Sequence, residues 1–500
     1  MKTTNISLEQ YELFIDGGFC VPENKNYFEV INPSNGEAIA KIAEGTAVDA
    51  RKAVAAARRA FDKGEWPKLS IHQRGEFLLK IANLIRENAK VLADLECQDT
   101  GKTLKQTTFI DVPTCADTFE YFASVEAQLK DSSIAIPADV KSLLAREPMG
   151  VVACIIPWNY PLIMTAWKMA PALIAGNTIV FKPSQVASLA IMKLADIIRQ
   201  AGLPKGVVNI VSGSGFEVGS ELAQNPDVDM ISFTGSSHIG QEVMRLASNN
   251  TKKVCLELGG KSPNIVFADC DLETAVGGTM SAIFMNQGQM CTAGSRLILD
   301  EKIYDKFMNL LVERTKKLKI GEAMSYETDF GPLISDAQRK TVLSFIEKGI
   351  KEGAKLVAGG KIPQSPELSK GFYVEPTIFT DVKNSMTIAQ EEIFGPVLSV
   401  IKFKTVDEAI AIANDTKYGL AACVWMKDLE KANKVSRQLR CGTVWVNTYG
   451  GFYNQAPYGG YKQSGFGREL GQDGLLEYTQ TKHICTDMTP GGKPLVSAWF

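Results

Sequence analysis

The chain has 500 residues, of which 45 % are apolar and 22 % are charged, and its formal net charge is −2. This length predicts two or three domains, and the composition is typical of a globular protein with a large apolar core. The near-neutral charge excludes nucleic acid or an anionic membrane surface as an electrostatic partner, and the lack of an apolar leader or of about 18 consecutive apolar residues predicts a cytoplasmic protein.

Two long amphipathic segments come first along the chain. "AVDARKAVAAARRAFDKG" and "HQRGEFLLKIANLIRENAKVLADLEC" repeat apolar residues with helical spacing and predict a helical hairpin over about residues 47 to 97. From "MGVVACIIPWN" onward, short apolar strands alternate with helices. The strand-like stretches are "VVACII", "TIVFKP", "VVNIVSG", "MISFTG", "KVCLELG" and "NIVFA". Because these strands lack polar alternation, they predict a doubly wound, Rossmann-like parallel sheet with helices on both faces.

A second alternation of strands and helices begins after "DLETAVGGTMSAIFMNQGQ" and continues to "TVWVN". The change near residues 257 to 265 predicts a domain boundary with a core on each side. The alternating stretch "DSSIAIPADVKSLLAREP" fits neither core. It predicts a protruding ribbon that pairs with the tail "HICTDMTPGGKPLVSAWF" across a subunit interface, and hence a homo-oligomer, either a dimer or a tetramer.

The predicted α/β fold therefore has three parts. A dinucleotide-binding domain covers residues 1–130 and 149–257, a second α/β catalytic domain covers 258–468, and a small β-ribbon oligomerisation domain covers 131–148 and 469–500. Ligands of open α/β sheets bind beyond the carboxyl ends of the strands, so we expect site residues at those ends.

Two glycine clusters are candidates for a phosphate site. "VVNIVSGSGFEVG" follows a strand, but its glycines (Gly213, Gly215 and Gly219) are spaced one residue off the dinucleotide fingerprint. In "MISFTGSSHIGQEVM" a strand turns at Gly235 into a helix whose first turn contains Gly240. A helix N-terminus there can hold a pyrophosphate on its unpaired backbone N–H groups. A tight turn without a ligand is an equally good interpretation of this motif alone.

The stretch "TIVFKPSQ" ends a strand with Lys182 and Ser184. Side chains at the strand ends of an open sheet face the ligand crevice, so these two can hold ribose hydroxyls or a phosphate. A solvated strand end is the alternative interpretation.

Ten cysteines are scattered without a close pair, which argues against a zinc site and against a disulfide framework. Most need no explanation beyond packing, but Cys291 stands among small and polar residues in "NQGQMCTAGSR". A thiolate attacks carbonyl carbon well, provided that a base and an oxyanion donor assist it. The three histidines lie outside every candidate motif, so we expect a carboxylate as the base.

Two residues can supply this assistance. Glu257 in "CLELGGKSP" ends a strand before two glycines, where a carboxylate can be held in a cleft; an exposed strand-end glutamate is the alternative. Asn159 in "IIPWNYPL" can donate its amide N–H to a developing oxyanion, with the backbone N–H of Cys291 as second donor. A turn-forming asparagine is the alternative interpretation of Asn159.

With these motifs in place, the chain resembles the aldehyde dehydrogenase superfamily over nearly its whole length. The shared motifs, in the family's order, are "PWNYP", "KPS", "FTGS", "LELGGKSP", "GQMC", "EEIFGPV" and "PYGGYKQSGFGRE". It is most similar to the betaine aldehyde and aminoaldehyde dehydrogenases, through "REPMGVV", "PWNYPL" and "QAPYGGYKQSGFGREL". The resemblance implies an oxidoreductase that converts an aldehyde into the carboxylic acid, with NAD or NADP as cofactor and without a metal.

The resemblance also implies roles for individual residues. Cys291 adds to the aldehyde, and the thioester left after hydride transfer to the nicotinamide is hydrolysed by water that Glu257 deprotonates. Asn159 is the oxyanion donor and Lys168 an auxiliary proton relay. The implied cofactor contacts are Ile156, Trp158, Lys182, Ser184, Gln185, Gly215, Gly235, Ser236, Gly240, Leu258, Glu392 and Phe394. The implied substrate contacts are Tyr160, Trp167, Met285, Met290, Thr292, Phe452 and Tyr458.

One departure from the family concerns the cofactor. Many NAD-preferring relatives read "KPSE", whereas this chain carries Gln185 in place of the glutamate. A carboxylate there accepts hydrogen bonds from the adenosine ribose and repels a 2'-phosphate, and a neutral amide loses that repulsion. We therefore predict that NADP is accepted alongside NAD.

A second departure concerns the substrate. Tyr160 and Trp167 match the aromatic box with which relatives bind a quaternary ammonium, but Met285 and Tyr458 stand where relatives carry Trp. "TYGGFYNQAPY" adds further aromatic candidates, namely Tyr449, Phe452 and Tyr453. Betaine aldehyde or an aminoaldehyde is therefore a candidate substrate, and larger apolar or aromatic aldehydes remain open.

Two alternatives come from other functional classes. A cofactor-independent, thioesterase-like hydrolase would use the same cysteine and glutamate, but it would not need "KPS", "FTGS" and "EEIFGPV", which are all present. A structural protein that kept only the fold would tolerate changes at Cys291, Glu257 or Asn159, and none of the three is changed.

Overall fold

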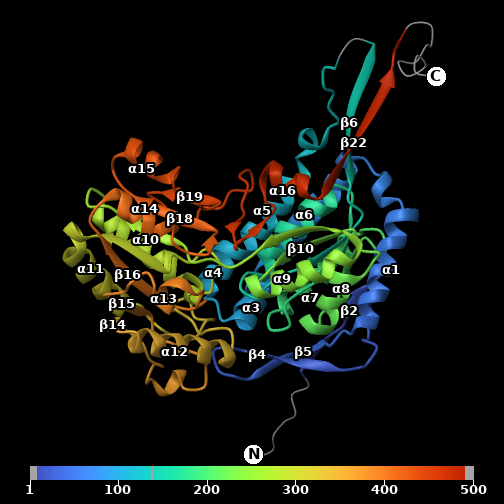
Figure 1. The fold of residues 1–500 in the computed structure, drawn as a ribbon. Helices are drawn as coiled ribbons and strands as arrows, with labels where there is room; N and C mark the ends of the chain where they lie inside the picture. Colours follow the sequence, from blue (N-terminus) through green and yellow to red (C-terminus); the bar gives the residue numbers. More distant parts are fainter. Residues whose placement is uncertain (1–7, 137–138, 490–500) are drawn as a thin grey trace, which may run out of the picture.

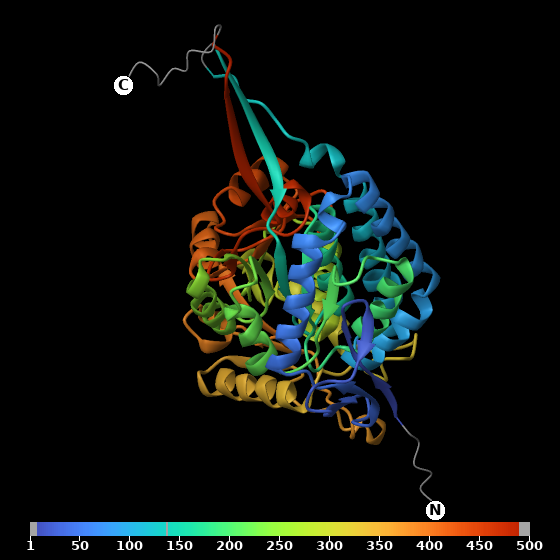
Figure 2. The same ribbon diagram turned by 90° about the vertical axis from the view of Figure 1, so that its right-hand side faces the viewer.

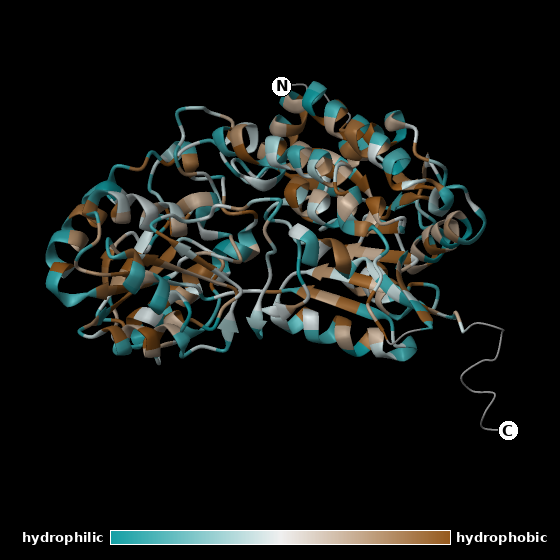
Figure 3. Cartoon of the chain, turned by 90° about the horizontal axis from the view of Figure 1, so that it is seen from above, coloured by the Kyte–Doolittle hydropathy of each residue, from teal (hydrophilic) through white to brown (hydrophobic). Residues whose placement is uncertain are grey.

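Two large sheets, each covered by helices, form the body of the molecule, and a two-stranded ribbon projects from it (Figure 1 and Figure 2). The computed structural model describes residues 8–136 and 139–489. Hydrophobic strands lie inside both units, and hydrophilic residues lie mainly on the outer helices and loops (Figure 3). Among the described residues, no helix combines the length and the apolar composition needed to cross a bilayer.

The first unit is built on an eight-stranded sheet in the order β21-β11-β10-β7-β8-β9-β2-β3. Its strands are β2 (Leu13–Ile15), β3 (Gly18–Cys20), β7 (Val151–Ile155), β8 (Thr178–Lys182), β9 (Val208–Ile210), β10 (Met230–Thr234), β11 (Lys253–Glu257) and β21 (Gly465–Phe466). Strands β11, β10, β7, β8 and β9 run parallel, which confirms the predicted doubly wound sheet. In β7, Val152 and Cys154 face one helical layer while Val151 and Ala153 face the other, so the strand has no polar position.

Helices cover both faces of this sheet. They are α1 (Ala47–Lys63), α2 (Ile71–Glu87), α3 (Ala89–Thr100), α4 (Leu104–Gln106), α5 (Val112–Ala123), α6 (Pro161–Ile174), α7 (Leu189–Ala201), α8 (Ser220–Gln224), α9 (Ser237–Ala247) and α16 (Gly471–Glu477). The predicted hairpin over residues 47 to 97 is wrong. Helix α1 packs on one face of the sheet through Ala50 and Ala53, whereas α2 packs in the core of the other face. The second predicted helix also breaks at Asn88, whose side-chain amide donates to the Leu84 carbonyl at 2.8 Å and ends α2.

The second unit is built on a seven-stranded sheet in the order β14-β15-β16-β13-β12-β18-β19, parallel except for β14. Its strands are β12 (Pro263–Val266), β13 (Arg296–Asp300), β14 (Lys355–Ala358), β15 (Thr377–Thr380), β16 (Val397–Phe403), β18 (Ala421–Trp425) and β19 (Thr443–Val446). Its helices are α10 (Leu272–Phe284), α11 (Tyr304–Lys316), α12 (Asp336–Lys351), α13 (Thr387–Gln390), α14 (Val406–Asn414) and α15 (Leu429–Ser436). The sheet changes between β11 and β12, within the stretch where the sequence pattern predicts a boundary.

The ribbon consists of β6 (Val140–Pro148) and β22 (Thr479–Asp487), which pair antiparallel along their whole length. The predicted pairing of residues 131–148 with the C-terminal tail is therefore present, but the two strands belong to one chain and not to two subunits. The strands pair within one chain because α16 leads directly into β22 beside the end of β6. There the Met149 N–H donates to the Tyr478 carbonyl at the base of the ribbon. Residues 490–500 of the predicted tail lie outside the described residues.

Segments distant in sequence tie the two units together. Strand β21 lies in the stretch predicted for the second domain, yet it is the edge strand of the first sheet, where Gly465 pairs with Glu257 of β11. Gly465 has a φ of 115°, and a Cβ there would collide with the Leu256 carbonyl, so only glycine permits this approach. Three small sheets complete the fold: β1 (Glu9–Tyr11) with β5 (Ala38–Ala43) and β4 (Tyr27–Ile31), β17 (Tyr418–Gly419) with β20 (Tyr461–Lys462), and the ribbon.

Candidate active site

A cavity of about 200 Å³ lies between the two units and contains most of the predicted catalytic and substrate residues. Its wall in the first unit comes from α6, where Tyr160, Ile163, Met164 and Trp167 follow one another with helical spacing and share one face. The opposite wall comes from the loop after α10 and from the segment between β19 and β20. The remaining lining residues are Ile110, Thr114, Thr234, Glu257, Leu258, Ser281, Met285, Met290, Cys291, Thr292, Tyr449, Gly450, Phe452, Tyr458 and Glu469.

The loop that carries Cys291 is held by asparagine side chains. Asn286 and Gln287 adopt left-handed backbone angles (φ 47° and 54°), which are costly for residues other than glycine. The Asn286 amide compensates by donating to the carbonyls of Asn159 and Gln289, at 3.1 and 3.2 Å. Asn286 was not among the predicted site residues. Its left-handed conformation has no signature in the sequence, although asparagine tolerates it better than most residues.

Cys291 is the nucleophile candidate, and it is a thiol in the resting structure. Burial raises the pKa of its thiol to about 11, the hydrogen bond with Tyr458 lowers it, and the carboxylates of Glu392 and Glu257 raise it. The Tyr458 hydroxyl lies 3.3 Å from Sγ of Cys291. The Cys291 thiol must lose its proton before it attacks, yet its titratable neighbours are two carboxyl groups and the Tyr458 hydroxyl.

Glu257 ends β11 with its side chain 3 % exposed, and neither carboxylate oxygen has a hydrogen-bond partner among the described residues. Burial, followed by repulsion from Glu469, holds the pKa of the Glu257 carboxyl group well above its usual range. Lys168, the predicted relay, is fully buried, forms an ion pair with Glu469 and donates to Ser232 Oγ at 3.0 Å. Glu469 thus pairs with the predicted relay and acts on the predicted base through its charge, although it was not among the predicted site residues.

Asn159 does not line the cavity. It is buried beneath the nucleophile loop, and its side-chain nitrogen donates to the Gln289 carbonyl at 2.9 Å. An amide nitrogen carries two hydrogens, so one donor remains for an oxyanion above it. The side-chain oxygen of Asn159 has no partner among the described residues.

The predicted substrate residues form an aromatic cluster. Trp167 meets Phe452 and Tyr458 edge to face, with ring centroids 5.6 and 5.2 Å apart, and Phe452 meets Tyr458 at 5.4 Å. Tyr160 is placed by the Gln106 amide, which donates to its hydroxyl at 3.1 Å. The predicted use of Tyr453 is wrong, because its side chain is 67 % exposed and lies outside the cavity lining.

Met285 stands at the mouth of this cavity. Ile110, Ser281 and Met285 line both the inner cavity and an outer hollow of about 540 Å³. Met290 and Thr292 flank the nucleophile in the inner cavity and are buried. The path from solvent to Cys291 therefore passes Met285 and is apolar.

The strand ends of the first sheet carry the predicted cofactor residues. Lys182 ends β8 and is buried, and within the described part of the chain its ammonium donates only to the Pro183 carbonyl, at 3.1 Å, and has no anionic partner. Burial lowers the pKa of Lys182 to about 8. Ser236 caps α9, and its hydroxyl accepts from the Ile239 N–H. A buried cation without an anionic partner and a free helix N-terminus fit the phosphates and ribose of a dinucleotide.

The remaining cofactor candidates are divided between contact positions and packing positions. Ser184 and Gln185 are partly exposed after β8, and a Cβ at Gly215 would meet only open space. A Cβ at Gly240 would collide with Leu258, so this glycine permits close packing of α9 on the chain after β11. Ile156 is buried, and its backbone N–H donates to the Lys182 carbonyl at 3.2 Å.

Glu392 and Phe394 approach from the second unit. Glu392 accepts from the Gly260 N–H at 3.0 Å, and burial raises the pKa of its carboxyl to about 7. The Phe394 ring meets Trp158 edge to face, with centroids 5.1 Å apart. Through these contacts Glu392 lies against the link between β11 and β12 and Phe394 against Trp158 of the first unit, an arrangement that fits their predicted role at the nicotinamide riboside end of a dinucleotide.

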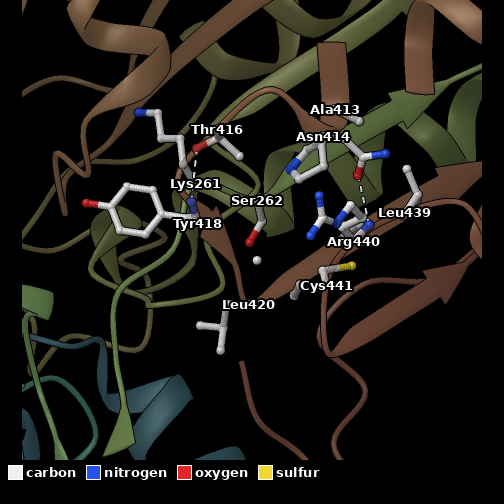
Figure 4. A pocket seen from close by; sticks show the side chains of 14 residues that line it. Lys261, Ser262, Ala413, Asn414, Thr416, Tyr418, Leu420, Leu439, Arg440 and Cys441 are labelled. Atoms are coloured by element: carbon white, nitrogen blue, oxygen red, sulfur yellow. Dashed lines mark hydrogen bonds between the residues drawn. The ribbon is translucent and has the colours of Figure 1, made fainter. Parts of the chain in front are cut away.

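A second, much smaller cavity lies beside β12 and β18 (Figure 4). Its volume is about 10 Å³, room for roughly one water molecule. Ser262, Leu420 and Cys441 surround it, while the amino end of Lys261 points away from them. It is too small for an aldehyde.

The family model for the aldehyde dehydrogenase family matches residues 20–484. The chain belongs to the aldehyde dehydrogenase family. It is 52 % identical over 489 residues to the betaine aldehyde dehydrogenase of Bacillus subtilis, covering 98 % of this chain and 99 % of that protein. It is 44 % identical over 482 residues to retinaldehyde dehydrogenase 3 of Rattus norvegicus, covering 96 % and 93 %.

Solved structures of aldehyde dehydrogenases share the fold. The crystal structure of betaine aldehyde dehydrogenase from Staphylococcus aureus in complex with NAD+ matches with a TM-score of 0.95 and 43 % identity, covering 98 % of this chain and 97 % of that one. The prediction of an aldehyde dehydrogenase is confirmed, and the thioesterase-like alternative has no support. The enzyme is an oxidoreductase of a family that uses NAD or NADP, and the solved relative from Staphylococcus aureus contains NAD+.

Proposed function

We propose that this aldehyde dehydrogenase oxidises betaine aldehyde or an aminoaldehyde to the corresponding acid. The observation that carries this proposal is the cluster of Trp167, Phe452 and Tyr458 beside Cys291, because aromatic rings bind a quaternary or primary ammonium group. The similar protein of Bacillus subtilis is named a betaine aldehyde dehydrogenase, which supports the same substrate class.

We propose that residues 1–130 and 149–257 bind the dinucleotide, with Lys182, Ser236 and Glu392 among its contacts, and that 258–468 supply the nucleophile. When bound, the nicotinamide accepts a hydride from the substrate carbon. Residues of the chain carry out the addition to the aldehyde and the hydrolysis of the thioester. Cys291 Sγ adds to the carbonyl carbon, and the amide of Asn159 donates to the oxygen that becomes negative.

Loss of hydride leaves a thioester on Cys291, which must be hydrolysed. Glu257 takes a proton from water as the water attacks the thioester carbon, and the C–S bond then breaks to release the acid and the thiolate. We propose that Lys168 and Glu469 accept the proton of Glu257 in turn; the ion pair between them and their charge effects on the Glu257 carboxyl group support the predicted relay role of Lys168. A base of raised pKa suits this step, because it binds the proton of water strongly.

The substrate proposal is tested with a pair of isosteric aldehydes. Betaine aldehyde and tert-butylacetaldehyde have the same shape, but only the first carries a positive charge. A cation bound by aromatic faces is favoured by about 1 to 2 kcal/mol, so we expect kcat/KM to be roughly fivefold to thirtyfold higher for betaine aldehyde. Equal values would overturn the cage proposal and favour larger apolar or aromatic aldehydes, which the apolar hollow beyond Met285 would accommodate.

We further propose that NADP is accepted alongside NAD. Gln185 is partly exposed after β8, and its neutral amide makes no hydrogen bond within the described part of the chain. Lys182 and Ser184 stand beside it. We expect kcat/KM for the two cofactors to lie within a hundredfold of each other, and Gln185→Glu to lower the value for NADP about tenfold while changing that for NAD little. A wild-type preference for NAD above a hundredfold, about 2.7 kcal/mol, contradicts this proposal.

We propose that the enzyme is a homo-oligomer, a dimer or a tetramer, assembled through the ribbon. In β22 every residue after Thr479 is exposed, and among the described strands β22 pairs only with β6, so the other edge of residues 479–486 has no strand beside it. An edge of this length is normally covered by another strand. The molar mass from light scattering decides between the two states.

We also propose that the enzyme is cytoplasmic. Its ten cysteines are all free, as is usual for proteins of a reducing compartment. Cell fractionation tests this location.

A further inference from the structure

The hydroxyl of Tyr458 touches the sulfur of the nucleophile. It lies 3.3 Å from Cys291 Sγ and has no other hydrogen-bond partner among the residues that the structure describes. The side chain is 5 % exposed, and its ring is held between Trp167 and Phe452. Its backbone is fixed to Glu469 by two hydrogen bonds of 2.8 and 2.7 Å. The hydroxyl is therefore placed against the sulfur by packing on several sides.

Among the described residues, none of the other titratable groups that face Cys291 donates a hydrogen bond to its sulfur. They are Glu257 at the end of β11, Glu392 after α13, Tyr160 at the start of α6 and Tyr449 after β19. The two carboxyl groups repel a negative sulfur. The Tyr449 hydroxyl donates to the Thr292 carbonyl, and the Tyr160 hydroxyl accepts from Gln106. Apart from the Thr292 backbone N–H, Tyr458 is the only donor to this sulfur within the described residues.

Among the described residues, no cation provides the electrostatic stabilisation that a thiolate at Cys291 needs. Lys168 is paired with Glu469 behind Glu257, and Lys102 lies 4.5 Å from the centre of the Tyr160 ring. Histidine, which pairs with the nucleophile in many cysteine enzymes, is absent from the cavity lining. A hydrogen bond to a charged acceptor in a site of low dielectric is stronger than one between neutral groups.

We propose that Tyr458 is a catalytic residue whose hydroxyl donates a hydrogen bond to the Cys291 thiolate and so increases the fraction of the nucleophile that is ionised. This inference rests on the proposed role of Cys291. Burial, together with the charges of Cys291 and Glu257, holds the pKa of Tyr458 well above its usual range, so the phenol keeps the proton that it donates.

The expected size of the effect follows from two opposing trends. Lowering a thiol pKa by one unit increases the thiolate fraction tenfold at pH values below the pKa, but it reduces the intrinsic nucleophilicity of the thiolate about threefold. The reaction rate of the thiol at pH values below its pKa therefore rises about threefold for each unit by which that pKa falls. Above the pKa the sign reverses, because every sulfur is then ionised and only the nucleophilicity differs.

The test is the rate at which iodoacetamide alkylates Cys291 as a function of pH, followed by mass spectrometry of its peptide in the full-length protein. For Tyr458→Phe we expect the apparent pKa to rise by one unit or more, with alkylation about threefold slower at neutral pH and faster than wild type at the alkaline end. Tyr449→Phe is the matched control: it removes a buried hydroxyl beside Cys291 that donates to a carbonyl, and its apparent pKa should match that of wild type.

Superimposable profiles for wild type and a folded Tyr458→Phe overturn the inference. If Tyr458→Phe fails to fold, ring-fluorinated tyrosine at position 458 replaces it, since a more acidic phenol is a stronger donor and should lower the apparent pKa of Cys291. An unchanged apparent pKa in that variant also overturns the inference. Failure of the proposed function is a separate result: the wild-type protein would then reduce neither NAD nor NADP with any aldehyde, whatever the alkylation profiles show.

Discussion

Cys291→Ala is expected to abolish aldehyde oxidation, with kcat falling by about 10⁴-fold or more. The sulfur forms the covalent bond to the substrate, and the cavity lining contains no second cysteine among the described residues. The substitution removes one atom from a partly exposed side chain, so the fold should be unaffected. Reduced nicotinamide, followed by its absorbance after aldehyde and cofactor are added, measures the loss.

The matched control for this variant is Cys270→Ala, which removes another partly exposed free thiol outside the cavity. It should retain wild-type kcat. If Cys291→Ala kept more than about one hundredth of the wild-type rate, the reaction would have to proceed without the thioester, and the mechanism proposed above would be wrong.

Glu257→Gln is expected to separate the two halves of the reaction. Without the carboxylate, Cys291 can still form the thioester, but water attacks it slowly, and general-base catalysis contributes about 10² to 10⁴-fold. We expect a burst of one equivalent of reduced cofactor per active site, followed by a steady rate lower by that factor. Rapid mixing resolves the burst, and mass spectrometry of the intact protein detects the acyl group on Cys291.

Glutamine has the shape of glutamate, and Glu257 makes no hydrogen bond among the described residues that the exchange would break. The melting temperature should therefore not fall, which distinguishes a chemical effect from unfolding. Glu367→Gln is a control at an exposed residue outside the cavity lining and should leave both phases unchanged. A steady rate in Glu257→Gln equal to that of wild type, without a burst, would assign the base to another group.

The first sheet could be predicted from the sequence in some detail, because buried parallel strands are short apolar runs bounded by helices. The six predicted strands from residue 151 to 266 are all present, and the sixth belongs to the second sheet. The hairpin over residues 47 to 97 failed for a physical reason. Helical periodicity shows that a helix has an apolar face, but it does not show which side of a sheet that face covers.

The candidate site could be predicted only where a motif marked it. Cys291, Glu257 and the aromatic residues of α6 stand in distinctive stretches, and the structure brings them to one cavity. Glu469 ends the motif "PYGGYKQSGFGRE", but nothing in that motif indicates that its side chain is buried beside Lys168. The contact between Tyr458 and Cys291 likewise depends on the return of the chain across the cleft, which no local pattern encodes.

Strand β21 also has a consequence for how the protein is made. The strand that ends in Glu257 obtains its edge partner from residues 465–466, more than 200 positions later, and the Leu258 N–H donates to the Ser464 carbonyl at the same place. The first sheet cannot be completed during synthesis until nearly the whole chain has left the ribosome. During synthesis the edge of β11 therefore stays unpaired until residues 465–466 emerge, and in this interval it can pair with strands of other chains unless a chaperone covers it.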